Sequence, residues 1–358
     1  MALQRTKLMK IAFHIDSPPC RPTGIGRYTG ELLKALQRRG MDVESWIRWR
    51  WKNHASELCR GTLIRPLLST GDFSDLLLPA VYSSMKGIRI IHSPNGNLLP
   101  FTGKACQTVM IHDLALHIFQ DLKPAEEVKH WKKKIAAAVK HADGILVNSA
   151  TTAADLEHFF PGSSSKTFIT RLGIDHLKRK PKGSGRGKHI LAVGTVEPRK
   201  NYVKLFASYR KLRLQSRSTP PLLIAGGMGY RSDEIRTCAG EGVHFTGYVS
   251  EKRLHELYRD ALLLVNPALY EGFGFSVPEA MKFGLPVVCS STSALGELFG
   301  EASYQVNPEN IDSITEGITQ ALEKGLTPSM KASSEKLFRT LSWNNCAEAT
   351  ERAFRALL

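Results

Sequence analysis

The segment from Leu262 to Cys289 constrains the fold more than any other part of the chain. The segment contains, in this order, an apolar run (262–265), a glycine-containing loop (270–275), a helix start and a second apolar run (286–289). Short continuous apolar runs are typical of strands buried in parallel sheets. In open α/β sheets, ligands bind beyond the carboxyl ends of such strands. The loop is therefore predicted to be a ligand site in an α/β fold.

Two carboxylates, Glu271 and Glu279, frame this loop with seven residues between them. Gly272 and Gly274 allow backbone N–H groups to approach a ligand closely. The N-terminus of the following helix favours a phosphate, and carboxylates accept hydrogen bonds from the hydroxyls of a sugar and a ribose. A structural role stays open for both: Ser276 and Glu279 have capping-box spacing, and Glu271 could be a solvated loop charge.

Taken whole, the run from Tyr270 to Met281 resembles the E-x7-E signature of retaining glycosyltransferases with the GT-B fold, particularly glycosyltransferase family 4. The resemblance implies that Glu271 lies beside the transferred sugar and that Glu279 holds the nucleotide ribose. It also implies that the intervening loop binds the donor. These loop residues are Gly272, Phe273, Gly274 and Phe275.

Predicted strands and helices alternate along almost the whole chain, which favours an α/β fold with parallel sheets. Strands are expected at 10–15, 88–92, 109–111, 144–148, 189–193, 222–224, 243–245, 262–265 and 287–289. Following the GT-B plan, we expect two Rossmann-like doubly wound domains that face a cleft. These are an N-terminal acceptor-side domain (1–176), a linker (177–188) and a C-terminal nucleotide-sugar-binding domain (189–342). The resemblance implies that a last helix, 343–358, packs back on the first domain.

A turn with two adjacent cations follows the first strand of the second half. Arg199 and Lys200 lie between that strand and a helix that opens at Asn201, where they can neutralise a diphosphate. A plain surface turn is the alternative. The run from Gly194 to Asn201 resembles the family 4 element in which the lysine contacts the donor diphosphate. Many relatives carry arginine directly after the first glycine; here Thr195 takes that place and is assigned to donor binding. Arg199 is therefore expected to supply the second cation.

Two further loops resemble donor-binding elements of the family. The run 247–250 corresponds to a loop whose backbone holds the nucleotide base, which assigns Tyr248 and Val249 as base contacts. The run 22–28 is not a dinucleotide fingerprint, because its glycines fall eight residues beyond Asp16 rather than directly after the strand. It resembles the family's glycine-rich acceptor-side loop, whose amides face the donor phosphate, and this assigns Gly26 to the donor.

The run from Ile111 to Leu114 ends a predicted strand and resembles the H-D-[LM] element at the catalytic centre of the family. His112 is therefore assigned a catalytic role beside Arg199, Lys200 and Glu271. A structural histidine is the alternative. Asp113 could cap the next segment or orient His112.

The resemblance implies transfer of a hexose from a nucleotide diphosphate donor to a hydroxyl, with retention through a same-face displacement. The motif forms look most like bacterial mannosyltransferases of surface-polysaccharide assembly, which favours GDP-mannose and a glycan or lipid-linked acceptor. UDP-glucose, UDP-galactose and UDP-N-acetylglucosamine stay open as donors, and a nucleotide-sugar 2-epimerase is a further alternative. No D-x-D motif occurs, so neither a metal site nor a cofactor is expected.

Positive charge is concentrated in the first half of a chain whose net charge is +16. Residues 1–182 hold 28 Lys and Arg against 15 Asp and Glu, whereas residues 183–358 hold 21 against 18. Such a field attracts nucleic acid, anionic lipids or phosphorylated substrates, and a solvated basic surface is the alternative. No helix-turn-helix, RNP or zinc pattern accompanies the charge, so no nucleic-acid partner is expected.

The run from Trp46 to Lys52 interleaves indoles with cations, a composition that suits a membrane interface. Trp49 could instead be core, and the segment from Lys129 to Lys140 is a second basic patch. Family 4 enzymes that extend lipid-linked glycans commonly dock through a basic N-terminal domain. We therefore expect a cytoplasmic protein, peripheral at the anionic inner face of the membrane, without a transmembrane helix or a signal peptide. Six scattered cysteines favour reduced thiols.

Overall fold

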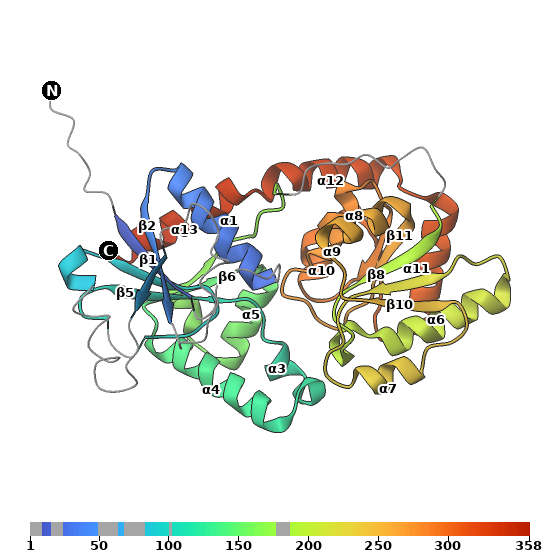
Figure 1. Cartoon of the computed structure of the whole chain (residues 1–358), viewed down its shortest axis with the longest axis horizontal. Coiled ribbons are helices and arrows are strands. Elements are labelled where there is room, and N and C mark those ends of the chain that lie inside the picture. The colour runs from blue at the N-terminus through green and yellow to red at the C-terminus, as the bar shows by residue number, and fades with distance from the viewer. Residues whose placement is uncertain (1–8, 16–23, 49–63, 68–82, 100–101, 177–186) are drawn as a thin grey trace.

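Two parallel β-sheets flanked by helices form the two halves of the molecule (Figure 1). The computed structural model describes residues 9–15, 24–48, 64–67, 83–99, 102–176 and 187–358. Every strand pairing that is described is parallel. The predicted α/β architecture of two doubly wound domains is confirmed. Most of the expected linker, 177–186, lies outside the described residues.

The first domain contains a seven-stranded sheet in the order β3-β2-β1-β4-β5-β6-β7. Its strands are β1 (Lys10–Ile15), β2 (Asp42–Arg48), β3 (Ile64–Leu67), β4 (Ile90–Ser93), β5 (Cys106–Ile111), β6 (Gly144–Val147) and β7 (Thr167–Ile169). Its helices are α1 (Gly24–Arg38), α3 (Ala115–Ile118), α4 (Ala125–His141) and α5 (Ala150–Phe159).

The second domain contains a six-stranded sheet in the order β10-β9-β8-β11-β12-β13. Its strands are β8 (His189–Val193), β9 (Leu222–Ala225), β10 (Val243–Gly247), β11 (Ala261–Asn266), β12 (Val287–Ser290) and β13 (Tyr304–Val306). Its helices are α6 (Tyr202–Gln215), α7 (Ser232–Thr237), α8 (Glu251–Asp260), α9 (Ser276–Lys282), α10 (Ser293–Phe299), α11 (Ile311–Lys324) and α12 (Pro328–Thr340).

The strand order creates a switch point in each sheet. In the first sheet β1 lies between β2 and β4, and in the second β8 lies between β9 and β11. At such a point the loops leaving adjacent strands diverge, which opens a crevice at the carboxyl ends. The sheets are rigid supports, because the side chains of β6 are all buried and those of β11 are buried except one.

The chain ends in the first domain. Helix α12 runs along the second domain, and α13 (Trp343–Ala356) lies against α1 and β6 of the first (Figure 1). Within the described ranges, no helix combines the length and hydrophobicity that a transmembrane span requires.

Candidate active site

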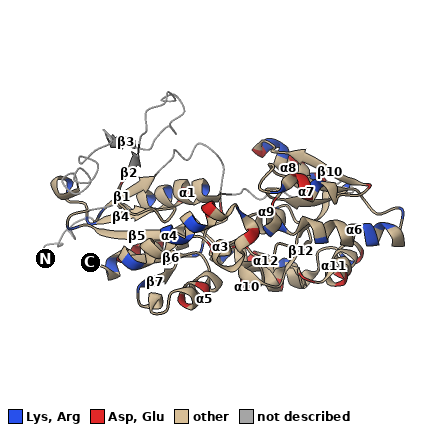
Figure 2. Ribbon diagram, turned by 90° about the horizontal axis from the view of Figure 1, so that it is seen from below, with Lys and Arg blue, Asp and Glu red and all other residues tan. Residues whose placement is uncertain are grey.

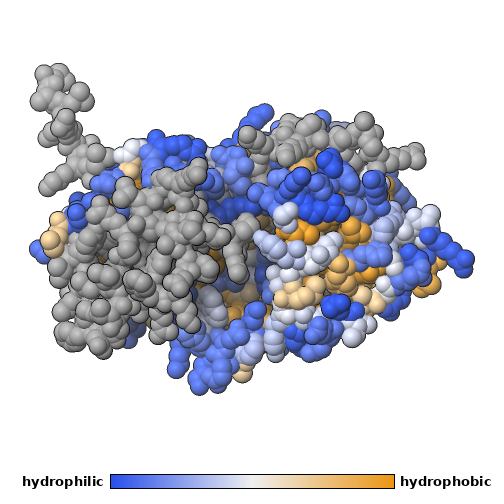
Figure 3. Space-filling model, viewed as in Figure 1, coloured by the Kyte–Doolittle hydropathy of each residue, from blue (hydrophilic) through white to orange (hydrophobic). Residues whose placement is uncertain are grey.

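A cavity of about 510 Å³ lies between the two domains, at the hollow seen in Figure 3. The first domain lines it with the start of α1 and with residues beyond β5 and β6, and the second domain with the loops after β8, β10 and β11. Most of the site residues predicted from the sequence line this cavity. They are His112, Arg199, Lys200, Tyr248, Val249, Glu271, Gly272, Phe273, Gly274, Phe275 and Glu279.

Two predicted donor residues, Gly26 and Thr195, are not among the residues that line the cavity. Gly26 lies one residue beyond the lining residue Ile25 in the first turn of α1. Thr195 is exposed, and its methyl group lies against Gly229, where an added Cβ would come within 2.7 Å of it. The donor roles of Gly26 and Thr195 stay predictions; Gly26 lies between the lining residues Ile25 and Arg27.

Glu271 is buried between two cations. Arg199 donates from Nη1 to Glu271 Oε2 at 2.8 Å, and the Lys200 ammonium pairs with Oε1. Burial alone would raise the pKa of Glu271, but Lys200 and Arg199 outweigh it and lower the pKa to about 2. The carboxylate is therefore ionised at any physiological pH. It can accept hydrogen bonds, but it cannot act as a general acid.

Backbone contacts hold the two cations against the loop after β11. The short 3₁₀ turn Pro198–Lys200 receives a hydrogen bond at the Arg199 carbonyl from Leu269 N, at 2.9 Å. Asn201, in the left-handed conformation that asparagine tolerates, donates from Nδ2 to Pro267 O at 3.0 Å. The cations and Glu271 are thus positioned by the ends of the adjacent strands β8 and β11.

Two positions of the loop after β11, 272 and 274, require glycine for steric reasons. A Cβ on Gly272 would lie 2.0 Å from the carbonyl oxygen of His112, so only glycine lets the loop touch the first domain there. Gly274 has φ of 81°, which favours glycine, and its Cβ would lie 2.4 Å from Leu295. The loop consequently approaches both the other domain and its own helix layer without a side chain.

Glu279 does not serve as a capping box. The first turn of α9 has no side-chain cap, and Glu279 instead bonds to two distant residues. Arg27 of α1 donates to Oε1 at 2.5 Å, and the Tyr258 hydroxyl donates to Oε2 at 2.8 Å. Burial, followed by the charge of Glu279, raises the pKa of Tyr258, so this hydroxyl remains a donor. The capping-box alternative is wrong, because both carboxylate oxygens face these tertiary partners.

His112 lies at the floor of the cavity with a defined orientation. Its Nε2 donates to the Pro94 carbonyl at 2.8 Å, and its ring meets the edge of Tyr28 at 5.2 Å between centroids. Burial lowers the pKa of His112, although the Pro94 carbonyl and Asp113 act in the opposite direction. The ring is neutral, and Nδ1 carries the lone pair.

A second cavity of about 270 Å³ adjoins the first on the side of α3 and α4. The two share Ile25, His112, Asp113 and Arg199. The second cavity is mainly apolar and includes the indole of Trp131. Lys123 of the first domain and Glu197 of the second also line it, with Lys123 Nζ 3.7 Å from Glu197 Oε2. Two different molecules could therefore meet at the shared residues.

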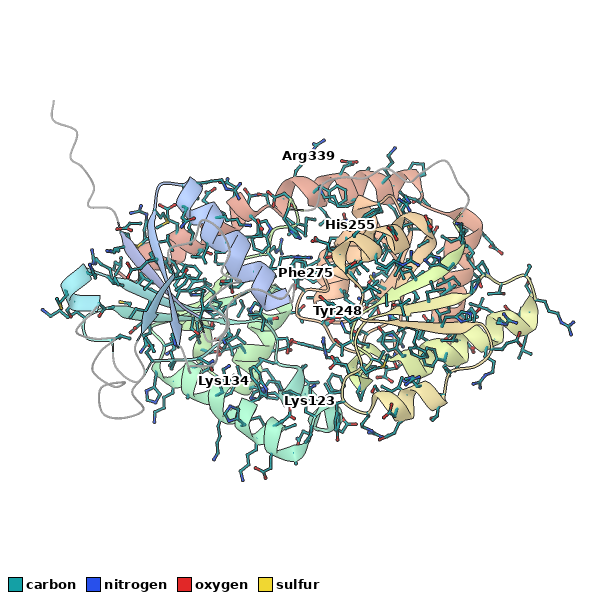
Figure 4. The ribbon with its side chains drawn as sticks, in the orientation of Figure 1. Lys123, Lys134, Tyr248, His255, Phe275 and Arg339 are labelled. Atoms are coloured by element: carbon teal, nitrogen blue, oxygen red, sulfur yellow. The ribbon has the colours of Figure 1, made fainter. Side chains whose placement is uncertain are left out.

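The loop after β10 forms the outer wall of the larger cavity. Figure 4 labels Tyr248 and Phe275 on the same side of the gap, with Phe275 beside the first turn of α1. Tyr248 is 72% exposed, so its ring adds little to the interior and its backbone is the better contact. The Phe275 ring lies 5.7 Å below the Arg27 guanidinium.

Three residues in contact with the site carried no role in the sequence prediction. Ser293 accepts a hydrogen bond from Glu271 N at 3.1 Å, and Tyr258 and Arg27 hold Glu279. Tyr258 lies in α8, and no signal in the sequence related it to its partner Glu279, 21 residues away. Across the described ranges, no group of His, Cys, Asp and Glu side chains could hold a metal ion.

The chain matches two family models in succession. Residues 22–176 match the model described as glycosyltransferase family 4, and residues 174–336 match the one described as glycosyl transferases group 1. The chain is also 29% identical to O-antigen chain mannosyltransferase B of Escherichia coli, over 98% of this chain and 100% of that protein. The chain is a glycosyltransferase whose first domain matches family 4. The family predicted from the sequence is therefore confirmed.

Solved structures place this glycosyltransferase in the GT-B fold. Anabaena HepE in complex with UDP and glucose superposes with a TM-score of 0.73 at 16% identity, over 96% of this chain and 99% of that one. Sucrose-phosphate synthase from Thermosynechococcus elongatus superposes with a TM-score of 0.70 at 18% identity, over 98% and 99%. At these identities the likeness concerns the fold.

Proposed function

We propose that the glycosyltransferase transfers mannose from GDP-mannose to a hydroxyl of a growing surface polysaccharide, with retention at the anomeric carbon. The observation that carries the choice of sugar and acceptor is the similarity, along the full length of both chains, to O-antigen chain mannosyltransferase B. The cavity between the domains supplies the donor site, with acceptors for hydroxyls at Glu271 and Glu279 and cations at Arg27, Arg199 and Lys200.

Glu271 is poorly suited to a double displacement through a glycosyl-enzyme. Its two oxygens are paired with Arg199 and Lys200, and those cations keep its pKa near 2. We infer a same-face displacement instead. The bond from C1 to the diphosphate oxygen breaks, the acceptor oxygen bonds C1 from the same side, and the departing phosphate oxygen takes the acceptor proton. Lys200 and loop N–H groups stabilise the charge that develops on the diphosphate.

The acceptor is proposed to enter through the smaller cavity. This cavity joins the donor cavity at His112 and Asp113, and its apolar wall with Trp131 suits the C–H face of a sugar ring. Neutral His112 then lies between the two substrates as a polar neighbour of the reacting atoms.

The donor is tested by melting the protein in the presence of a panel of nucleotide sugars. We expect GDP-mannose and GDP to raise the melting temperature, because a ligand that binds only the folded protein stabilises it. UDP-glucose, UDP-galactose and UDP-N-acetylglucosamine serve as matched ligands with another base. Stabilisation by UDP-sugars alone would reject GDP-mannose, and consumption of donor without any acceptor would favour an epimerase or a hydrolase.

We also propose that the protein associates with an anionic membrane surface at its first domain, where it would meet a lipid-linked acceptor. Helix α4 exposes Lys129, Lys133 and Lys140, and its lysines are visible in blue in Figure 2. Lys134 lies over the partly exposed ring of Trp131, with Nζ 4.2 Å from the centroid. Of the expected surface run, 49–52 lies outside the described residues, and for Trp46 and Arg48 only the backbone in β2 is described.

Co-sedimentation with lipid vesicles tests this surface. Binding should increase with the content of anionic lipid and decrease with salt, because charges are screened over about 10 Å at 0.1 M. Replacing Lys129, Lys133 and Lys140 by alanine should weaken binding. The matched control replaces three exposed lysines of the second domain, Lys324, Lys331 and Lys336. Equal binding to neutral and anionic vesicles would contradict the proposal.

A further inference from the structure

The charges that line the donor cavity do not suit an anionic ligand as they stand. The cations are Arg27, Arg199 and Lys200, and the carboxylates are Asp113, Glu251, Glu271 and Glu279. Carboxylates therefore outnumber cations by one among the described lining residues. A nucleoside diphosphate adds more negative charge, so at least one cation must change its partner when the ligand binds.

Arg199 is poorly placed to make that change. Its Nε and Nη2 donate to Glu197 at 3.3 and 3.0 Å, and its Nη1 donates to Glu271 and to the Tyr270 carbonyl. All three guanidinium nitrogens are thus engaged by the second domain itself. Arg199 holds Glu271 in position, and the loops that carry the partners of Arg199 fix the orientation of its guanidinium.

Arg27 is the cation that can exchange. It belongs to α1 of the first domain, and it reaches Glu279 of the second domain at 2.5 Å. Its Nη2 lies 4.0 Å from Glu251, a carboxylate whose side chain is 60% exposed. Because Tyr258 already donates to the other oxygen of Glu279, the Arg27 guanidinium occupies the place where a ribose hydroxyl would donate.

We propose that Arg27 is a donor-binding residue that exchanges its partner Glu279 for the diphosphate of the donor. This role rests on the proposed function, because it requires a nucleotide-sugar donor. Without ligand, Arg27 neutralises Glu279 across the cleft. When the ribose hydroxyls donate to Glu279, the guanidinium moves onto the diphosphate, whose oxygens match its planar fork. The move is favourable because a partly buried guanidinium left without an anion would be costly. The link between the domains then passes through the ligand.

The test compares a nucleoside diphosphate with its monophosphate. Isothermal titrations with GDP and GMP, repeated with UDP and UMP, are made on the wild type and on Arg27→Ala, Arg27→Lys and Arg38→Ala. We expect Arg27→Ala to weaken diphosphate binding about 10- to 100-fold, as expected for the loss of a charge-assisted contact. Monophosphate binding should stay equal or become tighter, because Glu279 is released. Arg27→Lys should fall between the two, and Arg38→Ala, an exposed arginine of the same helix, should match the wild type.

Other results would overturn the proposal or the donor assignment on which it rests. An equal loss for diphosphate and monophosphate, with a lower melting temperature, would make Arg27 a structural tie between the domains. Tighter binding of both nucleotides by Arg27→Ala would make it a latch that only opposes the ligand. Binding of UDP and not GDP would reject the GDP-mannose donor, and Arg27 would then be judged on UDP and UMP. No binding of any nucleotide by the wild type would reject both.

Discussion

Replacing Lys200 by alanine is expected to reduce sugar transfer by about 2–4 kcal/mol of transition-state stabilisation. The Lys200 side chain is 13% exposed in the donor cavity, pairs with Glu271 and lies within 3.0 Å of the position a Cβ on Gly194 would take. It is therefore a fixed positive charge at the carboxyl end of β8, where the departing diphosphate needs one. Initial rates of transfer as a function of donor concentration measure the loss in kcat/KM.

A matched lysine separates the effect of the site from that of charge in general. Lys204 lies in the first turn of α6, pairs with Glu309 and does not line the cavity. Lys204→Ala should transfer sugar at nearly the wild-type rate. Both variants should keep the circular dichroism spectrum of the wild type, because neither side chain belongs to the core. Transfer by Lys200→Ala at the wild-type rate would remove Lys200 from the site.

The positions of the site segments along the chain were predictable, because each follows from the residues next to it in the sequence. An apolar run followed by glycines and a helix start places a loop at the carboxyl end of a buried strand. The sequence in this way located the turn at Arg199 and Lys200 and the loop 271–275, which line one cavity in the structure. The strands expected at 10–15 and 189–193 have the bounds of β1 and β8.

The partners of these residues were not predictable, because they depend on how distant surfaces meet. Arg27 and Glu279 are 252 positions apart, and no periodicity relates them. Spacing alone left a capping box open for Glu279, whereas in the structure Arg27 and Tyr258 bond to its oxygens. Arg199 was expected to be available for the diphosphate, but Glu197, two residues away, holds two of its nitrogens. The role of a charged side chain is thus decided by its nearest counter-charge in three dimensions.

The return of the chain to the first domain depends on Trp343. The indole is 1% exposed at the start of α13, and its Nε1 donates to His176 Nδ1 at 2.9 Å. Its backbone N–H donates to Asp175 at 2.7 Å. Burial, together with the nearby cations Arg27, Lys282 and Lys34, lowers the pKa of His176 to about 3, so the neutral ring can accept from the indole.

Trp343→Ala is expected to destabilise the protein by about 3–5 kcal/mol, because the lost ring leaves a cavity in the core that joins α13 to the first domain. Trp343→Phe is the matched variant. It keeps an aromatic ring but leaves His176 Nδ1 without its donor, which should cost about 1–3 kcal/mol. Urea unfolding is followed by circular dichroism. The variants are compared by the urea concentration at the midpoint of unfolding, because a chain of two domains need not unfold in one step. If both variants lost the same stability, the indole N–H and not the buried ring would fix α13 in place; if neither lost any, α13 would be held by its other contacts alone.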